Sequence, residues 1–189
     1  MGSMSIDSNF EELLSLFIDR GVRFLVVGGY AYSSYGIPRG TKDLDLWVDA
    51  TPENAEKTWR ALAEFGMALG KIVPSDLSRP GPWLQFGREP QRVDVLTHVD
   101  GLVFAEAWKH RALRRMGGVD APMLSIDDLI ANKRAVGRPQ DVADVEVLER
   151  RQAEDSGEGC VSEKTAPRRR RPRRTAAATR GRTSKRRKR

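Results

Sequence analysis

The chain has 189 residues, which suits one domain with a tail, and hydrophobic residues make up 39% of it and charged residues 31%. Thirteen of the 33 Lys and Arg residues lie in 168–189, which holds no acid, so residues 1–167 carry 20 bases against 26 acids, a net charge of −6. There is no apolar run of about 18 residues, no signal pattern, one Cys and two His, which argues against a membrane span, a disulfide framework and a Cys- or His-based metal centre. These features predict a cytoplasmic protein whose metal chemistry would use carboxylates, the ligands that suit Mg²⁺.

The first half of the chain predicts three helices and two strands around a glycine pair. Apolar residues at helical spacing predict a helix over 9–20, capped by Asp7 or Ser8. The β-branched run 22–27 predicts a buried strand, followed by Gly28-Gly29 and a short helix over 30–35. The alternation in 43–48 predicts a half-buried strand, and Thr51-Pro52 opens a helix that runs to about residue 65.

The second half predicts a Pro-rich loop, two strands, a hairpin and a closing pair of helices. The loop spans 70–82, the strands 83–86 and 92–97, a helix 102–110 and a hairpin 113–123. Ser125 and Asp128 form a capping box for a helix over 125–136, and a last helix over 140–152 places Val142, Val145 and Leu148 on one face. The predicted domain is 4–153, because Met1-Gly2-Ser3 looks like a cloning remnant and 154–189 lacks apolar periodicity and is predicted to be disordered.

Three acids on two predicted strands suggest a metal site. Asp43 and Asp45 are two residues apart on one strand, so both project from the same face. Two carboxylates on one face repel unless a cation lies between them, and Mg²⁺ commonly binds one or two carboxylates together with substrate phosphates. Asp94, inside the strand RVDVL, could add a third carboxylate and complete a site for two metal ions.

Gly28-Gly29 lies between a strand and a short helix, fourteen residues before the first of these acids. A glycine pair at such a turn lets the backbone approach a phosphate, whose charge the helix N-terminus favours. Either feature alone is weak, since most glycine pairs are only turns and exposed strands often carry acids. The two in this order indicate a nucleoside triphosphate held by glycines at one end and by metal ions at the other.

The stretch FLVVGGYAYSSYGIPRGTKDLDLWV resembles the signature of the polymerase-β-like nucleotidyltransferase superfamily. Its motif order, GG-x-A and then G-x-P-R-x-T-x-D-x-D-L, is most similar to small bacterial nucleotidyltransferases of the AbiEii and MenT toxin type. The later segment LSIDDLIANKRAVGRPQDVADVEVLE resembles a second signature of that group. The resemblance implies an α/β (α+β) fold of the polymerase-β type, a twisted mixed sheet flanked by helices, with a helical pair closing the site.

The resemblance also implies roles for individual residues. Gly28 and Gly29 would contact the triphosphate, Asp43 and Asp45 would bind two Mg²⁺ ions, and Asp94 would be the third carboxylate and activate the incoming hydroxyl. Lys133 would reach the phosphates, and Asp141 would orient Lys133 or the base region, with Asp144 as a weaker candidate. Many members have Gly-Ser where this chain has Gly-Gly, so backbone amides, helped by Ser33, would replace the serine hydroxyl.

Several further residues carry both a functional and a structural interpretation. Arg39 and Lys42 would contact phosphate or an acceptor nucleic acid, or would only balance charge, and Thr41 shares the strand face of Asp43. Trp83 could stack on a base, whereas Trp47, Trp59 and Trp108 are predicted core residues and His98 a surface or core residue. Cys160 is an incidental thiol.

The predicted reaction is Mg²⁺-dependent transfer of a nucleoside monophosphate from an NTP such as ATP to an acceptor hydroxyl. RNA, especially a tRNA 3′ end, fits the resemblance and the basic residues 168–189, and a role as the toxin of a toxin–antitoxin pair would add an antitoxin partner. A protein or small-molecule hydroxyl fits the core equally well. A nucleic-acid-binding or partner-regulated module with a vestigial site, a sugar-nucleotide transferase, and a tail without function are the remaining alternatives.

Overall fold

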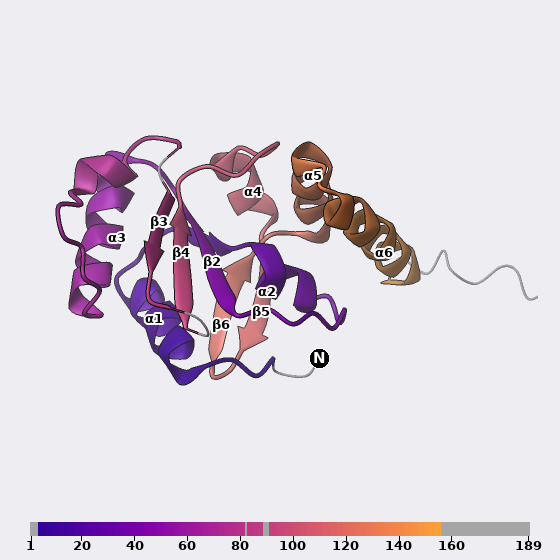
Figure 1. The fold of residues 1–189 in the computed structure, drawn as a ribbon, viewed down its shortest axis with the longest axis horizontal. Helices are drawn as coiled ribbons and strands as arrows, with labels where there is room; N and C mark the ends of the chain where they lie inside the picture. Colours follow the sequence, from indigo (N-terminus) through magenta and orange to yellow (C-terminus); the bar gives the residue numbers. More distant parts are fainter. Residues whose placement is uncertain (1–3, 82, 89–90, 156–189) are drawn as a thin grey trace, which may run out of the picture. The chain divides into compact units, whose positions relative to one another are not determined.

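The computed structural model describes residues 4–81, 83–88 and 91–155, and its centre is a six-stranded mixed sheet (Figure 1). The strand order is β3-β4-β2-β1-β6-β5. The strands are β1 (Phe24–Val26), β2 (Asp43–Val48), β3 (Trp83–Phe86), β4 (Arg92–Leu96), β5 (Ala112–Met116) and β6 (Val119–Met123). Strand β2 lies antiparallel to β1 and parallel to β4, so the two strands with the predicted acids are neighbours.

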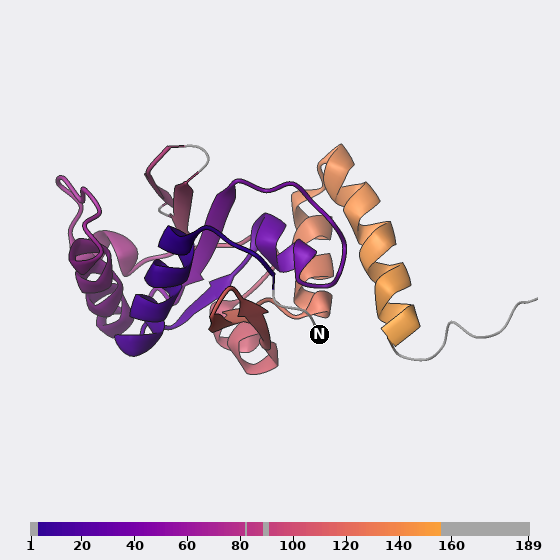
Figure 2. The same cartoon turned by 90° about the horizontal axis from the view of Figure 1, so that it is seen from below.

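Helices cover both faces of this sheet and enclose two separate hydrophobic clusters (Figure 2). On one face lie α1 (Ser8–Asp19) and α3 (Pro52–Glu64), which is followed by a 3₁₀ turn, η1 (Pro74–Leu77). On the other face lie α2 (Gly28–Ser33), α4 (Phe104–His110), α5 (Ile126–Val136) and α6 (Pro139–Asp155). None of the helices in the described ranges is long and apolar enough to span a bilayer.

The alternation along β2 is confirmed, because its residues divide between the two faces. Leu44, Leu46 and Val48 are fully buried in the cluster beneath α1 and α3. Asp43, Asp45 and Trp47 therefore face α2, α4 and α5, as the two-residue period of a strand requires. Trp47 is buried against the ring of Phe104, 5.0 Å away between centroids, while the two acids lie nearer the open end of this face.

The predicted helix caps are confirmed. The Asp7 carboxylate accepts the Asn9 N–H at 2.8 Å, and the Thr51 hydroxyl accepts the Asn54 N–H at 3.4 Å. At the start of α5, the Ser125 hydroxyl accepts the Asp128 N–H at 3.1 Å. Each cap satisfies an N–H that the helix itself leaves without a partner, which is why the helix starts could be read from the sequence.

Two expectations about the C-terminal region need correction. Helix α6 continues to Asp155, so the predicted helix end at 152 is too early, and residues 154 and 155, predicted to be disordered, are helical. Val142 does not share the buried face of Val145 and Leu148, because it is 56% exposed and the buried side chain of that first turn is Asp141. The remainder of the predicted disordered tail lies outside the described residues.

Smaller differences concern the ends of elements. The short helix after β1 begins at Gly28 itself, so the glycine pair forms its first turn. The strands predicted over 22–27 and 92–97 are shorter, at Phe24–Val26 and Arg92–Leu96, and the helix predicted over 102–110 begins at Phe104. Trp59 and Trp108 are half-buried and pack against the hydrophobic clusters, so they only border the core.

Candidate active site

The three predicted acids lie on adjacent strands and on one face of the sheet. Asp45 of β2 pairs in register with Asp94 of β4, and Asp43 pairs with Arg92. Asp43 and Asp45 are half-buried and line a cleft, whereas Asp94 is only 5% exposed and lies behind them. The parallel pairing of β2 and β4 thus assembles acids that are about fifty residues apart in the sequence.

Arg92 places a positive charge among these acids. Its Nη2 forms an ion pair with Oδ2 of Asp43, and its Nε lies 3.7 Å from Oδ2 of Asp94. The Gln85 amide of β3 donates to Oδ1 of Asp94 at 3.2 Å. Sequence reasoning passed over Arg92 and Gln85, although a basic residue two positions before Asp94 on the same strand was a usable signal.

The carboxyl group of Asp45 has a strongly raised pKa. Burial, and then the negative charges of Asp94 and Asp43, raise its pKa from 3.8 to about 7. Arg92 and a hydrogen bond from the Gly29 N–H act in the opposite direction. Asp45 therefore gains more from a nearby cation than an exposed carboxylate would, which is the behaviour expected of a functional-site acid.

The glycine pair fits closely against β2 and the segment before it. Gly28 has φ = +63°, and a Cβ there would lie 2.1 Å from Oδ2 of Asp45. A Cβ at Gly29 would lie 2.6 Å from the Thr41 hydroxyl oxygen. Any larger residue would have to displace Asp45 or Thr41, so the glycines bring the backbone at the start of α2 into the cleft beside the acids.

We predict that Gly28→Ala destabilises the protein and displaces Asp45. The left-handed backbone alone costs an alanine about 1–2 kcal/mol, and a shift of about 1 Å in a catalytic group can lower turnover roughly 100-fold. Thermal unfolding and turnover measure the two effects. Gly40→Ala is the matched control, since Gly40 lines the same cleft and has nothing within 4 Å of a Cβ. Equal losses in both variants would contradict the prediction.

Lys133 lies in a buried network of charges between α5 and α6. Its Nζ contacts Oδ2 of Asp144 at 2.5 Å and Oδ1 of Asp141 at 3.2 Å. Asp144 also forms an ion pair with Arg39, and Asp141 accepts a hydrogen bond from Nε of Arg138 at 2.6 Å. Lys133 is 6% exposed, so the alternative of a solvated helix face is wrong.

The contact of Lys133 with Asp141 agrees with the pairing predicted from the sequence. The contact of Lys133 with Asp144, the weaker candidate, is the shorter of the two. Hydrogen bonds from Arg138, followed by those from Lys133, lower the pKa of Asp141. Three cations here share two carboxylates, which leaves a net positive charge on the wall of the cleft.

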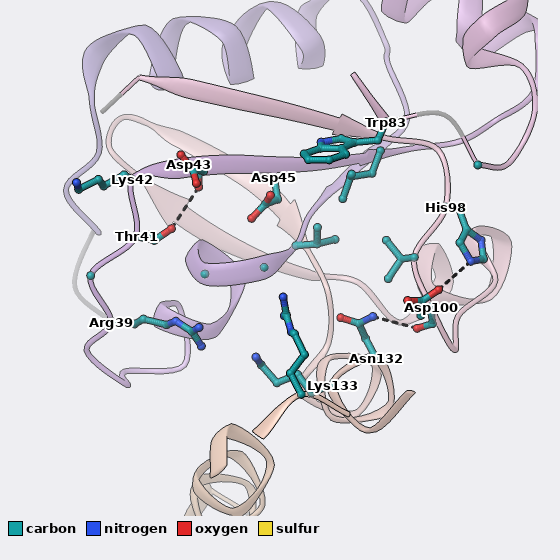
Figure 3. Close-up of a pocket in the computed structure, with 18 residues that line it drawn as sticks. Arg39, Thr41, Lys42, Asp43, Asp45, Trp83, His98, Asp100, Asn132 and Lys133 are labelled. Carbon is teal, nitrogen blue, oxygen red and sulfur yellow. Dashed lines mark hydrogen bonds and ion pairs between the residues drawn. The ribbon is translucent and has the colours of Figure 1, made fainter. Parts of the chain in front are cut away.

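Asp43 and Asp45, the two glycines and the cations of this network line one cleft of about 700 Å³ (Figure 3). Its lining includes Val27, Gly28, Gly29, Arg39, Thr41, Lys42, Asp43, Asp45, Trp83, Leu96, His98, Val99, Asp100, Asn132, Lys133 and Arg138. Arg39 and Lys42 lie at one end. At the other end His98 Nε2 lies 3.2 Å from the Asp100 carboxylate, and the Asn132 amide donates to the Asp100 carbonyl at 3.0 Å.

Three predicted site residues do not line this cleft: Asp94 and Asp141 are buried, and Ser33 lies elsewhere. Ser33 ends α2, and its hydroxyl donates to the Arg39 carbonyl at 3.5 Å. It lines a different cavity, beside Tyr35 and Arg114. Because Ser33 lies one helical turn beyond Gly29, at the other end of α2, the short helix carries it away from the cleft.

Asp43 and Asp45 fit a hard divalent cation. Oδ1 of Asp43 is buried without a hydrogen-bond partner, and Asp45 carries the raised pKa that a neighbouring cation would lower. Within residues 4–81, 83–88 and 91–155, no three His, Cys, Asp or Glu side chains converge closely enough to hold a metal ion. Asp94 is engaged by Gln85 and Arg92, so the expected three-carboxylate set is not assembled in this structure.

Comparisons with known proteins agree on one type of protein. A family model described as "Nucleotidyl transferase of unknown function (DUF2204)" matches residues 7–169. The lincosamide antibiotic adenylyltransferase LnuA, solved with lincomycin bound, has a TM-score of 0.51 at 14% identity over 78% of this chain and 98% of LnuA. ANT(2″)-Ia, in complex with adenylyl-2″-tobramycin, has a TM-score of 0.54 at 13% identity over 80% of this chain and 91% of its own. A search of curated protein sequences finds no match.

Proposed function

The chain belongs to the DUF2204 family of nucleotidyl transferases and has the polymerase-β-like nucleotidyltransferase fold, and from this premise we propose that it transfers a nucleoside monophosphate from an NTP to an acceptor hydroxyl with Mg²⁺ as cofactor. The observation that carries this proposal is the position of the glycine turn directly against Asp45. That contact brings backbone amides, two cleft-lining carboxylates and the cations of the cleft within reach of one bound triphosphate.

The reaction forms a bond between the acceptor oxygen and the α-phosphorus and breaks the bond from that phosphorus to the bridging oxygen of pyrophosphate. The acceptor hydroxyl loses its proton, and Asp94, on the strand next to Asp45, is the proposed group that receives it. When bound by Asp43 and Asp45, Mg²⁺ would neutralise charge on the phosphates and on the attacking and leaving oxygens.

The remaining residues bind and orient the triphosphate. The N-cap residue of α2, Val27, makes no side-chain cap, so the Gly28 N–H is the proposed backbone donor to a phosphate oxygen, while the Gly29 N–H donates to the Asp45 carboxyl group. Lys133, Arg39 and Lys42 supply positive charge around the same space. These contacts hold the leaving pyrophosphate in place while the hydroxyl attacks, which lowers the entropic part of the barrier.

The direct test is incubation of the full chain with each α-labelled NTP and Mg²⁺, with RNA, protein and small hydroxylated molecules as separate acceptor pools. We expect transfer of label to one pool, release of pyrophosphate, and loss of both on addition of EDTA. No transfer from any NTP together with retained RNA binding would instead support a binding module with a vestigial site.

An RNA 3′ hydroxyl is our proposed acceptor, and the thirteen Lys and Arg residues of 168–189 support it. We predict that a chain ending at Asp155 binds tRNA more weakly than the full chain. Binding by the full chain should fall about 10³-fold or more between 50 and 200 mM salt if six or more phosphates are contacted. Equal affinity and equal salt dependence for the two chains would show that the basic segment does not bind RNA.

A small-molecule acceptor is the second candidate, favoured by the folds of LnuA and ANT(2″)-Ia and by a cleft of the size that small ligands occupy. A toxin role rests on the motif resemblance to AbiEii- and MenT-type proteins. Growth arrest on expression in bacteria, absent for Asp45→Asn, would distinguish that role from a metabolic one.

A further inference from the structure

The cleft has an uncharged surface directly beside its acids, formed by Trp83 and Leu96. These two residues are paired in register on β3 and β4, two residues along each strand from the pair of Gln85 and Asp94. Because faces alternate with a period of two, Trp83 and Leu96 share the face of Asp45 and Asp94, about 7 Å further along the strands. We call Trp83 and Leu96 the shelf.

Trp83 differs from the other tryptophans that flank the sheet. Trp47, in the same row of the sheet, is 2% exposed and packs on Phe104, whereas Trp83 is 60% exposed. Its indole lies along the cleft beside Asp45 (Figure 3), and Val27 and Val99 add apolar lining. A large aromatic surface is therefore open to a ligand within a site that is otherwise polar.

The charges of the cleft show which part of a nucleotide would lie there. Arg39 and Lys42 lie at the end away from Trp83 (Figure 3), and the glycine turn lines the same cleft. At the end near Trp83, His98 and Asp100 are paired with each other. A triphosphate therefore matches the cationic end, and an uncharged ring matches the shelf.

We infer that the shelf is the nucleobase platform of the incoming NTP, with the base stacked on the indole of Trp83. This inference rests on the proposed function. The nucleoside is attached to the α-phosphorus, which must lie beside Asp45. Only the sugar separates the base from that phosphorus, so the base must lie close to the acids. The shelf, about 7 Å along the strands from Asp45, lies within that reach. Stacking depends on ring area and reads no base edge, so the platform favours purine over pyrimidine nucleotides without strict selection.

The test is equilibrium binding of a non-hydrolysable ATP analogue and of inorganic tripolyphosphate to the full chain in the presence of Mg²⁺. Loss of base stacking on an aromatic side chain weakens binding by about 5- to 100-fold in proteins that bind single-stranded nucleic acids. We expect Trp83→Ala to weaken the ATP analogue about tenfold and to leave tripolyphosphate unchanged. Trp83→Phe should keep most of the affinity, because a smaller aromatic ring still stacks.

Leu113→Ala is the control, since Leu113 is 64% exposed on β5, at the opposite edge of the sheet. Wild-type affinity of Trp83→Ala for the ATP analogue would overturn the platform, and a raised KM for the acceptor in that variant would assign Trp83 to the acceptor instead. Equal weakening of tripolyphosphate would also overturn it, by showing a general distortion. If the wild-type chain binds neither probe, the proposed function fails as well.

Discussion

Asp45→Asn is expected to abolish nucleotidyl transfer and at the same time to stabilise the metal-free protein. Turnover should fall by at least ~10²–10³-fold, the usual loss when one preorganised electrostatic group is removed from an active site. Asn keeps the size of the side chain, so the contact with the glycine turn is retained. The stability gain follows from the raised pKa of about 7, because burial and two neighbouring acids disfavour the ionised carboxylate.

The sign of this effect depends on pH. The folded-state pKa of Asp45 lies above the ordinary value of 3.8, so the unfolded chain loses its proton at lower pH than the folded chain. Ionisation of Asp45 thus lowers the stability of the wild type progressively from about pH 4 to about pH 7, and the whole loss is present above that range. Asp45→Asn should therefore be more stable than the wild type at pH 8 and equal to it near pH 4.

Thermal unfolding in EDTA at several pH values, with turnover measured separately, tests both parts. Asp120→Asn is the control, because the Asp120 side chain is 65% exposed on β6. That variant should keep wild-type turnover. Near-normal turnover of Asp45→Asn would remove Asp45 from the site, and a stability difference independent of pH would contradict the electrostatic cause.

Local pattern was enough to predict β2 and the glycine turn. The run DLDLWV alternates in polarity, and a strand with one face in a core has little choice about which residues it buries. Gly28 has a positive φ and a close contact, two conditions that only glycine meets at little cost. The alternation of β2 and the turn at Gly28 depend on neighbours in the sequence and could be predicted without knowledge of the fold, whereas the contact of Gly28 with Asp45 on another element could not.

Cross-strand and helix–helix contacts could not be predicted in the same way. Arg92 lies among the acids only because β4 pairs in parallel with β2 in one particular register. The sequence alone does not show which face of the sheet Trp83 occupies, because that depends on how the edge strand β3 packs against helices distant in the sequence. The polar run at 132–134 suggested an accessible Lys133, and only the packing of α6 on α5 shows that it is buried.

Lys133→Met is expected to lower stability and phosphate affinity together. Removing one partner from a buried ion pair typically costs about 3–5 kcal/mol, and the lower end applies here because Asp141 keeps Arg138 and Asp144 keeps Arg39. Loss of a charge-assisted contact should weaken tripolyphosphate binding roughly 10- to 100-fold. Unfolding by denaturant and equilibrium binding measure the two losses.

A purely structural lysine would also destabilise the protein when removed, so a second variant must separate the two roles. Asp144→Asn leaves Lys133 in place and removes the carboxylate that lies 2.5 Å from its Nζ. That carboxylate competes with phosphate for the charge of Lys133. If Lys133 binds the triphosphate, this variant should bind tripolyphosphate more tightly than the wild type, while Lys133→Met binds it more weakly. Effects of opposite sign on affinity cannot come from damage to the fold alone.

Lys109→Met serves as the control, because the Lys109 side chain is 63% exposed and forms an ion pair with Glu106 of the same helix. It should change neither stability nor affinity. Wild-type binding of tripolyphosphate by both Lys133→Met and Asp144→Asn would mean that Lys133 only joins α5 to α6. The positive charge at the phosphates would then have to come from Arg39 and Lys42, and the resemblance of the C-terminal segment to a nucleotide-binding signature would lose its physical basis.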